Sequence, residues 1–428
     1  MRIVTTGNKL TWLALFAGLL VSAGVLAGEI EVTASSPAAG DEFGKSVAVS
    51  GNYAIVGNYL DDNPNGIDAG SAEIFVYNGG TWLREAVLTA GDGAADDWFG
   101  YSVAISGTIA VIGAPRHTNN TGNIGAAYVF QRSSGVWTQV AKLTPSDGAS
   151  KDFFGWSVAI DGDYIVVGSP RHNIGVNADV GAAYVYYRNS GGVDNWGEQS
   201  QLTASDGAAD DRFGSSVAIS GAYVLVGSPQ DDVGTNSLAG AAYVYLRNGT
   251  TWGEQQKLVP TDVAQNRQFG FSVSISGARA LIGAPFDNND STGAAYVFTR
   301  SGTTWNQQQK LTAGDGAAGD KFGYSVSLFD TTLVIGSPFD NTGRGALYPF
   351  VLLGGNWVQF SKVQASDGAA GDKFGLAVSI QGTTVVAGAP NDTVSGLANA
   401  GSAYFYHTVN DLALPVALIS FTATPGDG

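Results

Sequence analysis

The sequence predicts an all-β fold, a seven-bladed β-propeller whose blades are four-stranded antiparallel sheets. A Phe-Gly pair recurs seven times, at intervals of 56, 55, 59, 56, 53 and 52 residues. Each interval holds four short runs of alternating apolar and polar residues, separated by Gly, Asn, Asp and Ser. A regular period of this length indicates a repeat architecture, and four antiparallel strands per period indicate propeller blades. The pairs begin at Phe43, Phe99, Phe154, Phe213, Phe269, Phe322 and Phe374.

The fifth period shows the four expected strands in order. Residues 271–276 alternate apolar and serine residues, and Ser-Gly then turns the chain into 279–283. After a loop, 293–298 forms the third run and 305–311 the fourth. No segment after the N-terminal apolar stretch keeps the 3.6-residue apolar spacing of a helix.

The two ends of the repeat predict that the ring is closed by the N-terminal strand. The last period stops after its third run, at 402–406, and lacks a fourth. Residues 31–35 match 201–205, which form such a fourth run. The first strand of the mature chain should therefore complete the last blade and cover its free edge. An open solenoid would not need its first strand to complete its last repeat.

Composition limits the chemistry and the partners. The chain has 428 residues, 60 of them Gly, with no Cys and only three His, so disulfides and thiol chemistry are excluded. The net charge of −16 should repel nucleic acid and anionic lipid. We expect an extracellular protein or glycan as the partner, no nucleic acid, no membrane insertion after signal cleavage, and a monomer.

The termini predict export. Residues 1–27 read as a signal peptide, with an apolar core at 10–23 and Ala27 at a small-residue cleavage site. An uncleaved anchor is the alternative, because 10–27 is just long enough to span a bilayer. The propeller should occupy 28–408, and 409–428 should be a tail or the start of a truncated further region. The expected location is secreted, extracellular or at the cell surface.

The second half of each repeat carries a resemblance. Gly-Ala-Pro or Gly-Ser-Pro follows Phe-Gly at a fixed distance in six repeats, and the first repeat departs from it with Gly57-Asn58-Tyr59. This pattern resembles the FG-GAP repeat of the integrin alpha-chain head and of related bacterial secreted proteins. The resemblance covers about 29–406 and implies a seven-bladed propeller used in adhesion or ligand binding. The six triplets begin at Gly113, Gly168, Gly227, Gly283, Gly336 and Gly388.

The resemblance also implies Ca²⁺ between the first two strands, but the sequence lacks the ligands there. The turns are Ser-Gly or similar, without the series of oxygen ligands that Ca²⁺ requires, and only Asp161 and Asp163 supply two carboxylates. We therefore expect no cofactor and no Ca²⁺ at that position.

Carboxylates instead recur in the links between blades, as Asp pairs five residues apart. One interpretation is that Asp-Gly makes the turn and the second Asp accepts from backbone N–H groups. The other is a cation site that bridges the pair. The candidates for such a site are Asp315, Asp320, Asp367 and Asp372, together with Asp161 and Asp163.

The strand directions place these links and the loops after Gly-x-Pro on one face, which we expect to be acidic. Two blades break the acidic series with Arg-His, which indicates either duplication of a blade or a cationic notch for a carboxylate or sulfate. His there would titrate near neutral pH. Phe286 and Phe339 are expected to offer exposed aromatic contacts. The candidate ligand face comprises Arg116, His117, Arg171, His172, Asp231, Asp287, Phe286, Phe339, Asp340 and Asp392.

Six tryptophans open fourth strands and are expected to pack between blades and not to bind sugars. No catalytic motif is present, although a carboxylate pair of the glycosidase type stays open because Asp is plentiful. The sequence thus predicts a non-catalytic binding or adhesion module for a protein or glycan ligand. The alternatives are a propeller-based polysaccharide lyase or hydrolase, and a purely structural surface component. The six are Trp82, Trp137, Trp196, Trp252, Trp305 and Trp357.

Overall fold

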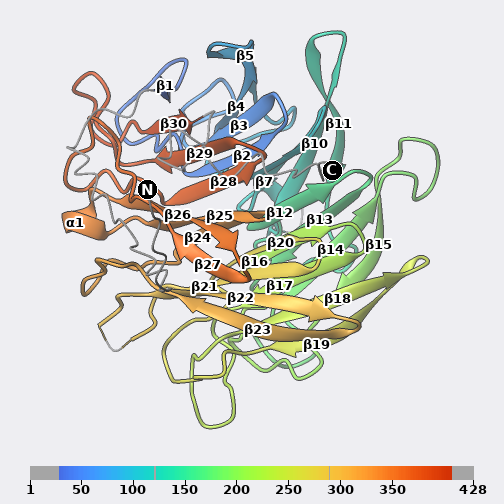
Figure 1. Cartoon of the computed structure of the whole chain (residues 1–428). Coiled ribbons are helices and arrows are strands. Elements are labelled where there is room, and N and C mark those ends of the chain that lie inside the picture. The colour runs from blue at the N-terminus through green and yellow to red at the C-terminus, as the bar shows by residue number, and fades with distance from the viewer. Residues whose placement is uncertain (1–27, 120–121, 289, 407–428) are drawn as a thin grey trace, which may run out of the picture.

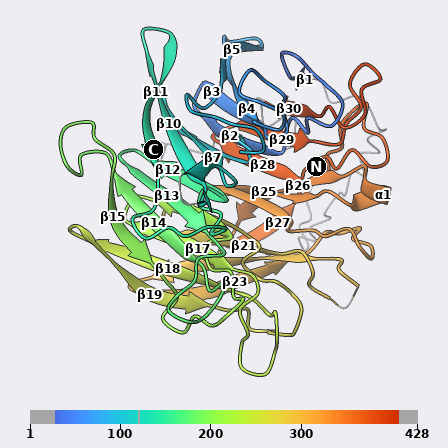
Figure 2. The ribbon, with the colours of Figure 1, turned by 180° about the vertical axis from the view of Figure 1, so that it is seen from behind.

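Seven four-stranded antiparallel sheets stand in a ring around a central channel (Figures 1 and 2), which confirms the predicted propeller. The computed structural model describes residues 28–119, 122–288 and 290–406. The predicted signal peptide and the 409–428 tail lie outside these residues. Within them, no helix has the length and apolar character needed to cross a membrane.

Each blade except the last takes its four strands in chain order, from the channel outward, and in blade 2 the short strands β8 and β9 intervene in a loop. Blade 1 is β2 (Ser46–Ser50), β3 (Tyr53–Asn58), β4 (Ser71–Tyr77) and β5 (Trp82–Leu88). Blade 2 is β6 (Ser102–Ser106), β7 (Ile109–Ala114), β10 (Ala126–Ser133) and β11 (Val136–Leu143). Blade 3 is β12 (Ser157–Asp161), β13 (Tyr164–Ser169), β14 (Ala182–Tyr187) and β15 (Gly197–Leu202). Blade 4 is β16 (Ser216–Ser220), β17 (Tyr223–Ser228), β18 (Ala241–Asn248) and β19 (Thr251–Leu258).

The remaining blades follow the same order. Blade 5 is β20 (Ser272–Ser276), β21 (Arg279–Ala284), β22 (Ala294–Ser301) and β23 (Thr304–Leu311). Blade 6 is β24 (Ser325–Phe329), β25 (Thr332–Ser337), β26 (Ala346–Leu353) and β27 (Asn356–Gln359). Blade 7 is β28 (Ala377–Gln381), β29 (Thr384–Ala389), β30 (Ser402–Tyr406) and the N-terminal β1 (Glu29–Thr33). Short elements in the loops are β8 (Thr118–Asn119), β9 (Gly122–Asn123) and the helical turn α1 (Asp340–Gly343).

The N-terminal strand closes the ring as predicted. β1 pairs antiparallel with β30 over five residues, from Glu29 opposite Tyr406 to Thr33 opposite Ser402. The innermost strands β28 and β2 also contact each other, so the blue and red ends of the described chain lie side by side in Figure 1. Pairing β1 in this way gives β30 a neighbour on its outer edge, which would otherwise offer unpaired backbone groups.

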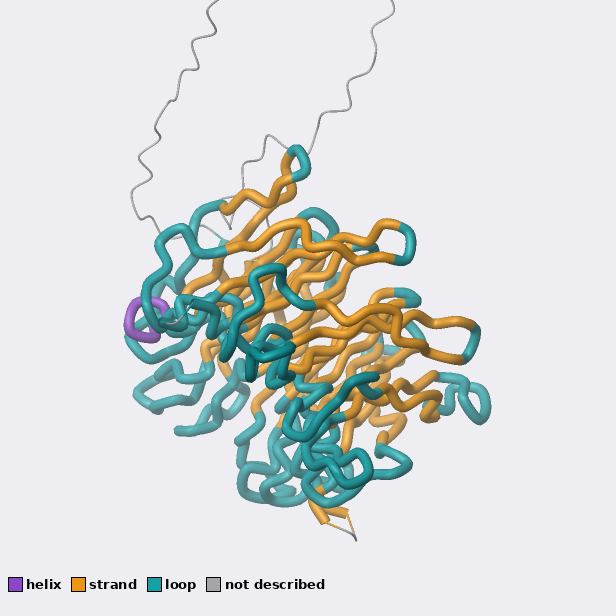
Figure 3. Tube along the Cα trace, turned by 90° about the horizontal axis from the view of Figure 1, so that it is seen from below, coloured by secondary structure: helices purple, strands orange, loops and turns teal. Residues whose placement is uncertain are grey.

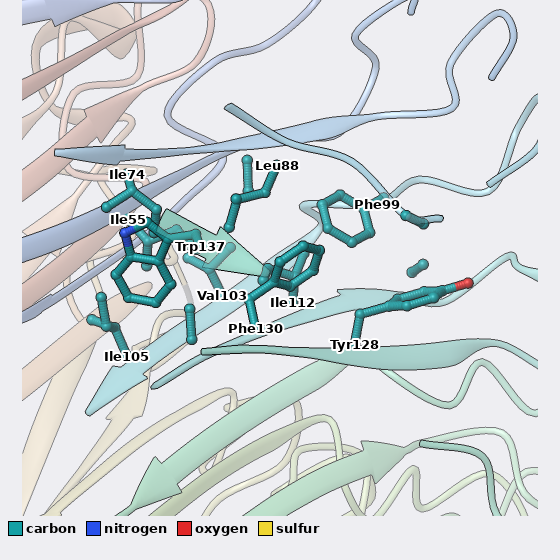
Figure 4. Close-up of a cluster of buried hydrophobic side chains, with 14 of the residues drawn as sticks. Ile55, Ile74, Leu88, Phe99, Val103, Ile105, Ile112, Tyr128, Phe130 and Trp137 are labelled. Atoms are coloured by element: carbon teal, nitrogen blue, oxygen red, sulfur yellow. The ribbon is translucent and has the colours of Figure 1, made fainter. Parts of the chain in front are cut away.

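The hydrophobic core is divided into seven clusters, one between each pair of neighbouring blades. Figure 4 shows the cluster between blades 1 and 2, where Trp137 and Phe130 of blade 2 face Ile55 and Ile74 of blade 1. All six fourth-strand tryptophans are buried in such clusters, which confirms that they pack between blades. Because each blade has buried apolar residues on both faces, it requires a neighbour on each side.

The glycines of the repeat allow two blades to touch through their backbones. Gly155 has a φ of +91°, and a Cβ there would collide with the carbonyl oxygen of Ala126. A Cβ on Gly113 would collide with the carbonyl oxygen of Gly155 in the next blade. Ser102 donates to that same oxygen over 2.8 Å. The Phe-Gly and Gly-x-Pro motifs therefore build the contact between neighbouring blades, and the Phe fills the core beside it.

The links between blades and the loops from second to third strands lie at the same end of the ring, as predicted. The backbone N–H of Phe154, in the link to blade 3, donates to the carbonyl of Ile124 in the loop of blade 2 over 2.9 Å. Figure 3 shows the loops gathered at one end of the strands, with hairpin turns at the other. We call the end with the links the loop face.

Candidate ligand-binding site

The second Asp of each link pair stabilises the link itself. Asp97 accepts from the backbone N–H of Ala94 at 2.8 Å, Asp211 from Ala208 at 2.6 Å, and Asp320 from Ala317 at 2.7 Å. These aspartates are buried, and burial raises the pKa of Asp211 to about 6. The structure confirms the interpretation that this residue accepts backbone hydrogen bonds.

The first Asp of each pair belongs to a polar network inside its blade. In blade 4, Lys257 Nζ lies 2.8 Å from Asp206 and 2.9 Å from Asp231. Tyr243 donates to Asp206 over 2.8 Å. Burial alone would raise the pKa of Asp206, but the hydrogen bonds from Lys257 and Tyr243 outweigh it and lower the pKa. Equivalent lysines, Lys142, Lys310 and Lys362, neutralise the first Asp in blades 2, 5 and 6.

These networks show that the expected ring of exposed aspartates on the loop face is wrong. Asp231, Asp287 and Asp340 were expected to face a ligand, but they are only 2%, 0% and 3% exposed. Each is paired with the lysine of its own blade at 2.5–2.9 Å. The loop after Gly-x-Pro turns these side chains inward, beneath the link. There a Tyr hydroxyl donates a hydrogen bond to each carboxylate and a Lys forms an ion pair with it. Asp392 is half-buried.

The expected cationic notch is also only partly correct. His117 and His172 are 5% and 6% exposed and do not reach the surface. Each places Nδ1 2.8 Å from the buried Asp of its link, Asp97 or Asp152. They occupy the place that aspartate takes in blades 4 to 6, so they belong to the same structural networks. In contrast to the histidines, Arg116 and Arg171 are partly exposed.

The candidate cation pairs do not converge on a site. Asp161 accepts from the backbone N–H of Gly221 in the next blade at 2.7 Å, whereas Asp163 lies 3.7 Å from Arg188. Asp315 pairs with Lys362 at 2.9 Å, and Asp320 holds its own link. Asp372 likewise accepts from the backbone N–H of Ala369.

Blade 7 departs from the other networks. Glu31 replaces the lysine, and oxygens of Glu31, Asp367 and Asp392 lie within 4.8 Å of one another. In the described part of the chain no Lys or Arg forms an ion pair with these three carboxylates. Burial raises the pKa of Glu31, and the charge of Asp367 raises it further. Exposed acidic groups commonly cluster without a metal, so these three carboxylates do not by themselves indicate a metal site.

One position that varies from repeat to repeat lies at the channel opening on the loop face. The residue after each Phe-Gly lines a cavity of about 280 Å³ in the channel. Four of these seven residues are aromatic, and we call them the mouth aromatics: Tyr101, Trp156, Phe271 and Tyr324. The ring centres of Tyr101 and Trp156 lie 4.7 Å apart, and those of Phe271 and Tyr324 lie 4.8 Å apart. All four are half-buried, so each keeps some surface for a ligand.

A second set of rings and cations surrounds the mouth aromatics. Phe286 and Phe339, predicted as ligand contacts, pack edge-on against Phe271 and Tyr324. Lys321 lies 4.2 Å from the ring centre of Phe339. On the other side of the opening, the guanidinium of Arg116 lies 4.4 Å from the ring of Trp98 and that of Arg171 lies 4.9 Å from Phe153. Cations this close to ring faces are attracted to them and hold their charge near the opening.

The mouth aromatics were missed in the sequence, although a signal was present. They sit at the variable position of the motif Phe-Gly-x-Ser-Val, which six of the seven repeats keep. At that position the alternation of a strand does not show whether a side chain faces the channel or the core. Four residues that the sequence predicted as ligand contacts do lie around this opening: Arg116, Arg171, Phe286 and Phe339. The result is an aromatic opening, with cations at its rim, in a chain whose net charge is −16.

The fold and this opening define a class, a β-propeller with a ring of variable residues at one end of its channel. The FG-GAP repeat family matches this chain at 28–75, 82–130, 137–186, 196–245, 252–298, 305–350 and 357–406. The chain belongs to that family.

Two known proteins are similar to this chain, one over about a third of it and the other over nearly all of it. Integrin alpha-6 of Gallus gallus is 28% identical over 163 residues, which is 36% of this chain and 15% of the integrin. The chain therefore spans only a small part of that relative's length. A chain in a crystal structure of the mitotic checkpoint complex superposes with a TM-score of 0.54 at 10% identity, covering 95% of this chain and 99% of the other. That likeness shows the fold alone.

Proposed function

We propose that this protein is a non-catalytic binding module, secreted or held at the cell surface, whose ligand contacts the opening of the channel on the loop face. The observation that carries the proposal is the arrangement of Tyr101, Trp156, Phe271 and Tyr324 around one cavity. Constant residues of the repeat build the ring, and variable residues meet at its centre. Half-buried aromatic side chains in a concave site supply contact area at a low cost in conformational entropy.

The location is proposed from the relative and from composition. The relative is an integrin alpha chain, and the N-terminal 27 residues have the pattern of a signal peptide. The strongly acidic composition fits a partner that is neither nucleic acid nor anionic lipid. An extracellular protein or a glycan is therefore the proposed ligand class. The proposed contact surface is the channel opening, because the carboxylates first expected to bind are largely buried or paired.

An array of immobilised glycans and extracellular-matrix proteins tests the proposal, run with and without a metal chelator. We expect at least one component to retain the wild-type protein. The Trp156→Ala/Tyr324→Ala variant should lose this retention, whereas Val136→Ala, on the exposed β10–β11 hairpin at the other end of the ring, should keep it. Thermal unfolding of both variants verifies folding. Retention by nothing, or equal retention of both variants, would overturn the proposal.

A further inference from the structure

Three lysines stand at one sector of the channel opening. Lys45 lines the cavity, with its Nζ 5.5 Å from the ring centre of Tyr101. Lys321 and Lys373 occupy the same position of two neighbouring repeats, immediately before Phe-Gly, with φ of 55° and 59°. Lys321 contacts the rings of Phe286 and Phe339, which pack against the mouth aromatics. We call Lys45, Lys321 and Lys373 the mouth lysines; they come from blades 1, 6 and 7.

The charge of Lys373 opposes the charges of both other mouth lysines. Burial lowers the pKa of Lys45; the charge of Glu42 opposes this effect, and the smaller effect of the charge of Lys373 adds to it. Burial likewise lowers the pKa of Lys321, and Lys373 again adds to the effect. Placing like charges together at a partly buried site costs stability unless an anion joins them.

None of the mouth lysines has a carboxylate partner. Among the described residues, no ion pair or hydrogen bond joins their ammonium groups to Asp or Glu. Glu42, whose charge acts on Lys45, accepts a hydrogen bond from the hydroxyl of Tyr59 at 3.1 Å. This contrasts with the lysines of the blade networks, such as Lys257 and Lys362, which lie within 2.9 Å of two carboxylates each. In so acidic a chain, three lysines at a single opening that form no ion pair with Asp or Glu point to an anion supplied from outside.

The remaining groups at the opening favour a sugar over a peptide. The rim is rich in hydrogen-bond donors, from the mouth lysines together with Arg116 and Arg171. The carboxylates beside the two arginines already lie close to a cation, since Asp96 is 3.9 Å from Arg116 and Asp179 is 3.9 Å from Arg171. Sugar hydroxyl and carboxylate oxygens accept from lysine and arginine, and the apolar face of a sugar ring can stack on an aromatic ring.

We infer that the channel opening binds a carboxylated glycan, with the uronate carboxylates at the mouth lysines and a sugar ring on the mouth aromatics. This inference rests on the proposed function, since it names the ligand class of the same opening. The two sets of residues then have different roles. The mouth lysines bind the carboxylates, and the mouth aromatics supply contact area.

Titration with polygalacturonate oligomers tests the inference, measured by calorimetry at low and high salt. Fully methyl-esterified oligomers keep the sugar backbone and remove the charge, so they should bind at least about tenfold more weakly. The Lys321→Gln/Lys373→Gln variant should lose about tenfold in affinity for the charged oligomer and little for the ester. Lys151→Gln is the matched control, because Lys151 is exposed in a link and also forms no ion pair. Wild-type affinity should fall as salt rises.

The outcomes separate this inference from the proposed function. Equal binding of charged and esterified oligomers, or an equal loss in the Lys151 control, would overturn the role of the mouth lysines. Binding of poly-glutamate in place of the oligomers would overturn the glycan assignment in favour of an acidic peptide. If the array finds a neutral ligand whose retention needs Trp156 and Tyr324, the proposed function stands and this inference fails. If the array and the oligomers both give no binding, both fail.

Discussion

The hydroxyl of Ser102 in blade 2 donates to the carbonyl of Gly155 in blade 3 over 2.8 Å. Five other blade contacts repeat this bond: Ser46 to Gly100, Ser157 to Gly214, Ser216 to Gly270, Ser272 to Gly323 and Ser325 to Gly375. The exception is the contact between blades 7 and 1, where Ala377 stands in place of the serine. The innermost strands are thus joined by side chain to backbone bonds close to the channel opening.

Replacing Gly155 by Ala tests whether this contact needs glycine. The Cβ would meet the carbonyl of Ala126, and the left-handed φ adds strain, so we expect a loss of roughly 3 kcal/mol or more in unfolding free energy. Gly162→Ala is the control, because φ is +58° and nothing lies within 4 Å of its Cβ. It should cost about 1 kcal/mol. Denaturant unfolding measures both, and similar losses would contradict the account.

Deletion of residues 28–33 tests ring closure. β1 supplies the whole outer strand of blade 7, so its loss should lower the melting temperature and expose the edge of β30 to other molecules. We expect self-association by size-exclusion chromatography. A synthetic peptide of residues 28–36, added in excess, should restore the monomer. An unchanged melting temperature would mean that closure contributes nothing to stability.

Exchanging the network residue of blades 4 and 7 tests the role of the lysines. Glu31→Lys puts an ammonium between Asp367 and Asp392, as Lys257 lies between Asp206 and Asp231, and should stabilise the fold by roughly 0.5 kcal/mol. Lys257→Glu leaves the buried Asp231 without its cation and should lower the unfolding free energy by roughly 3 kcal/mol. Urea unfolding of both variants measures these values. Stabilisation by Lys257→Glu, or destabilisation by Glu31→Lys, would contradict this account.

The buried His172 predicts a dependence of stability on pH. Burial acts to lower its pKa, but the hydrogen bond and charge of Asp152, with Asp147, outweigh burial and raise the pKa above 6.5. The folded state therefore holds this proton more tightly than the unfolded state. Its contribution to stability is complete below pH 6.5 and is lost as pH rises through the folded pKa. Unfolding free energy measured from pH 6 to 8 should fall less steeply in His172→Asn, and an identical slope would contradict this role.

Most of the fold could be predicted from the sequence, and only part of the site. The Phe-Gly spacing and the match of 31–35 to 201–205 were sufficient for blade number and closure, because repeats bury a core only against neighbours. The directions of loop side chains were not predictable. Asp231 and His117 lie in turns, where no two-residue period separates inside from outside, and the lysine and tyrosine that receive them come from other strands. The mouth aromatics could be predicted only by knowing which end of each innermost strand lies at the channel opening.

The indole N–H signals in a two-dimensional NMR spectrum test the central claim, that ligand binds at the channel opening. Trp156 lines the cavity and Trp98 stacks on Tyr101 beside it, whereas the six fourth-strand tryptophans are buried between blades. Titration with a ligand retained on the array, and with a polygalacturonate oligomer, should shift the signals of Trp98 and Trp156. Trp156→Phe and Trp98→Phe assign the two signals. Shifts confined to Trp82, Trp137, Trp196, Trp252, Trp305 or Trp357 would contradict binding at the opening.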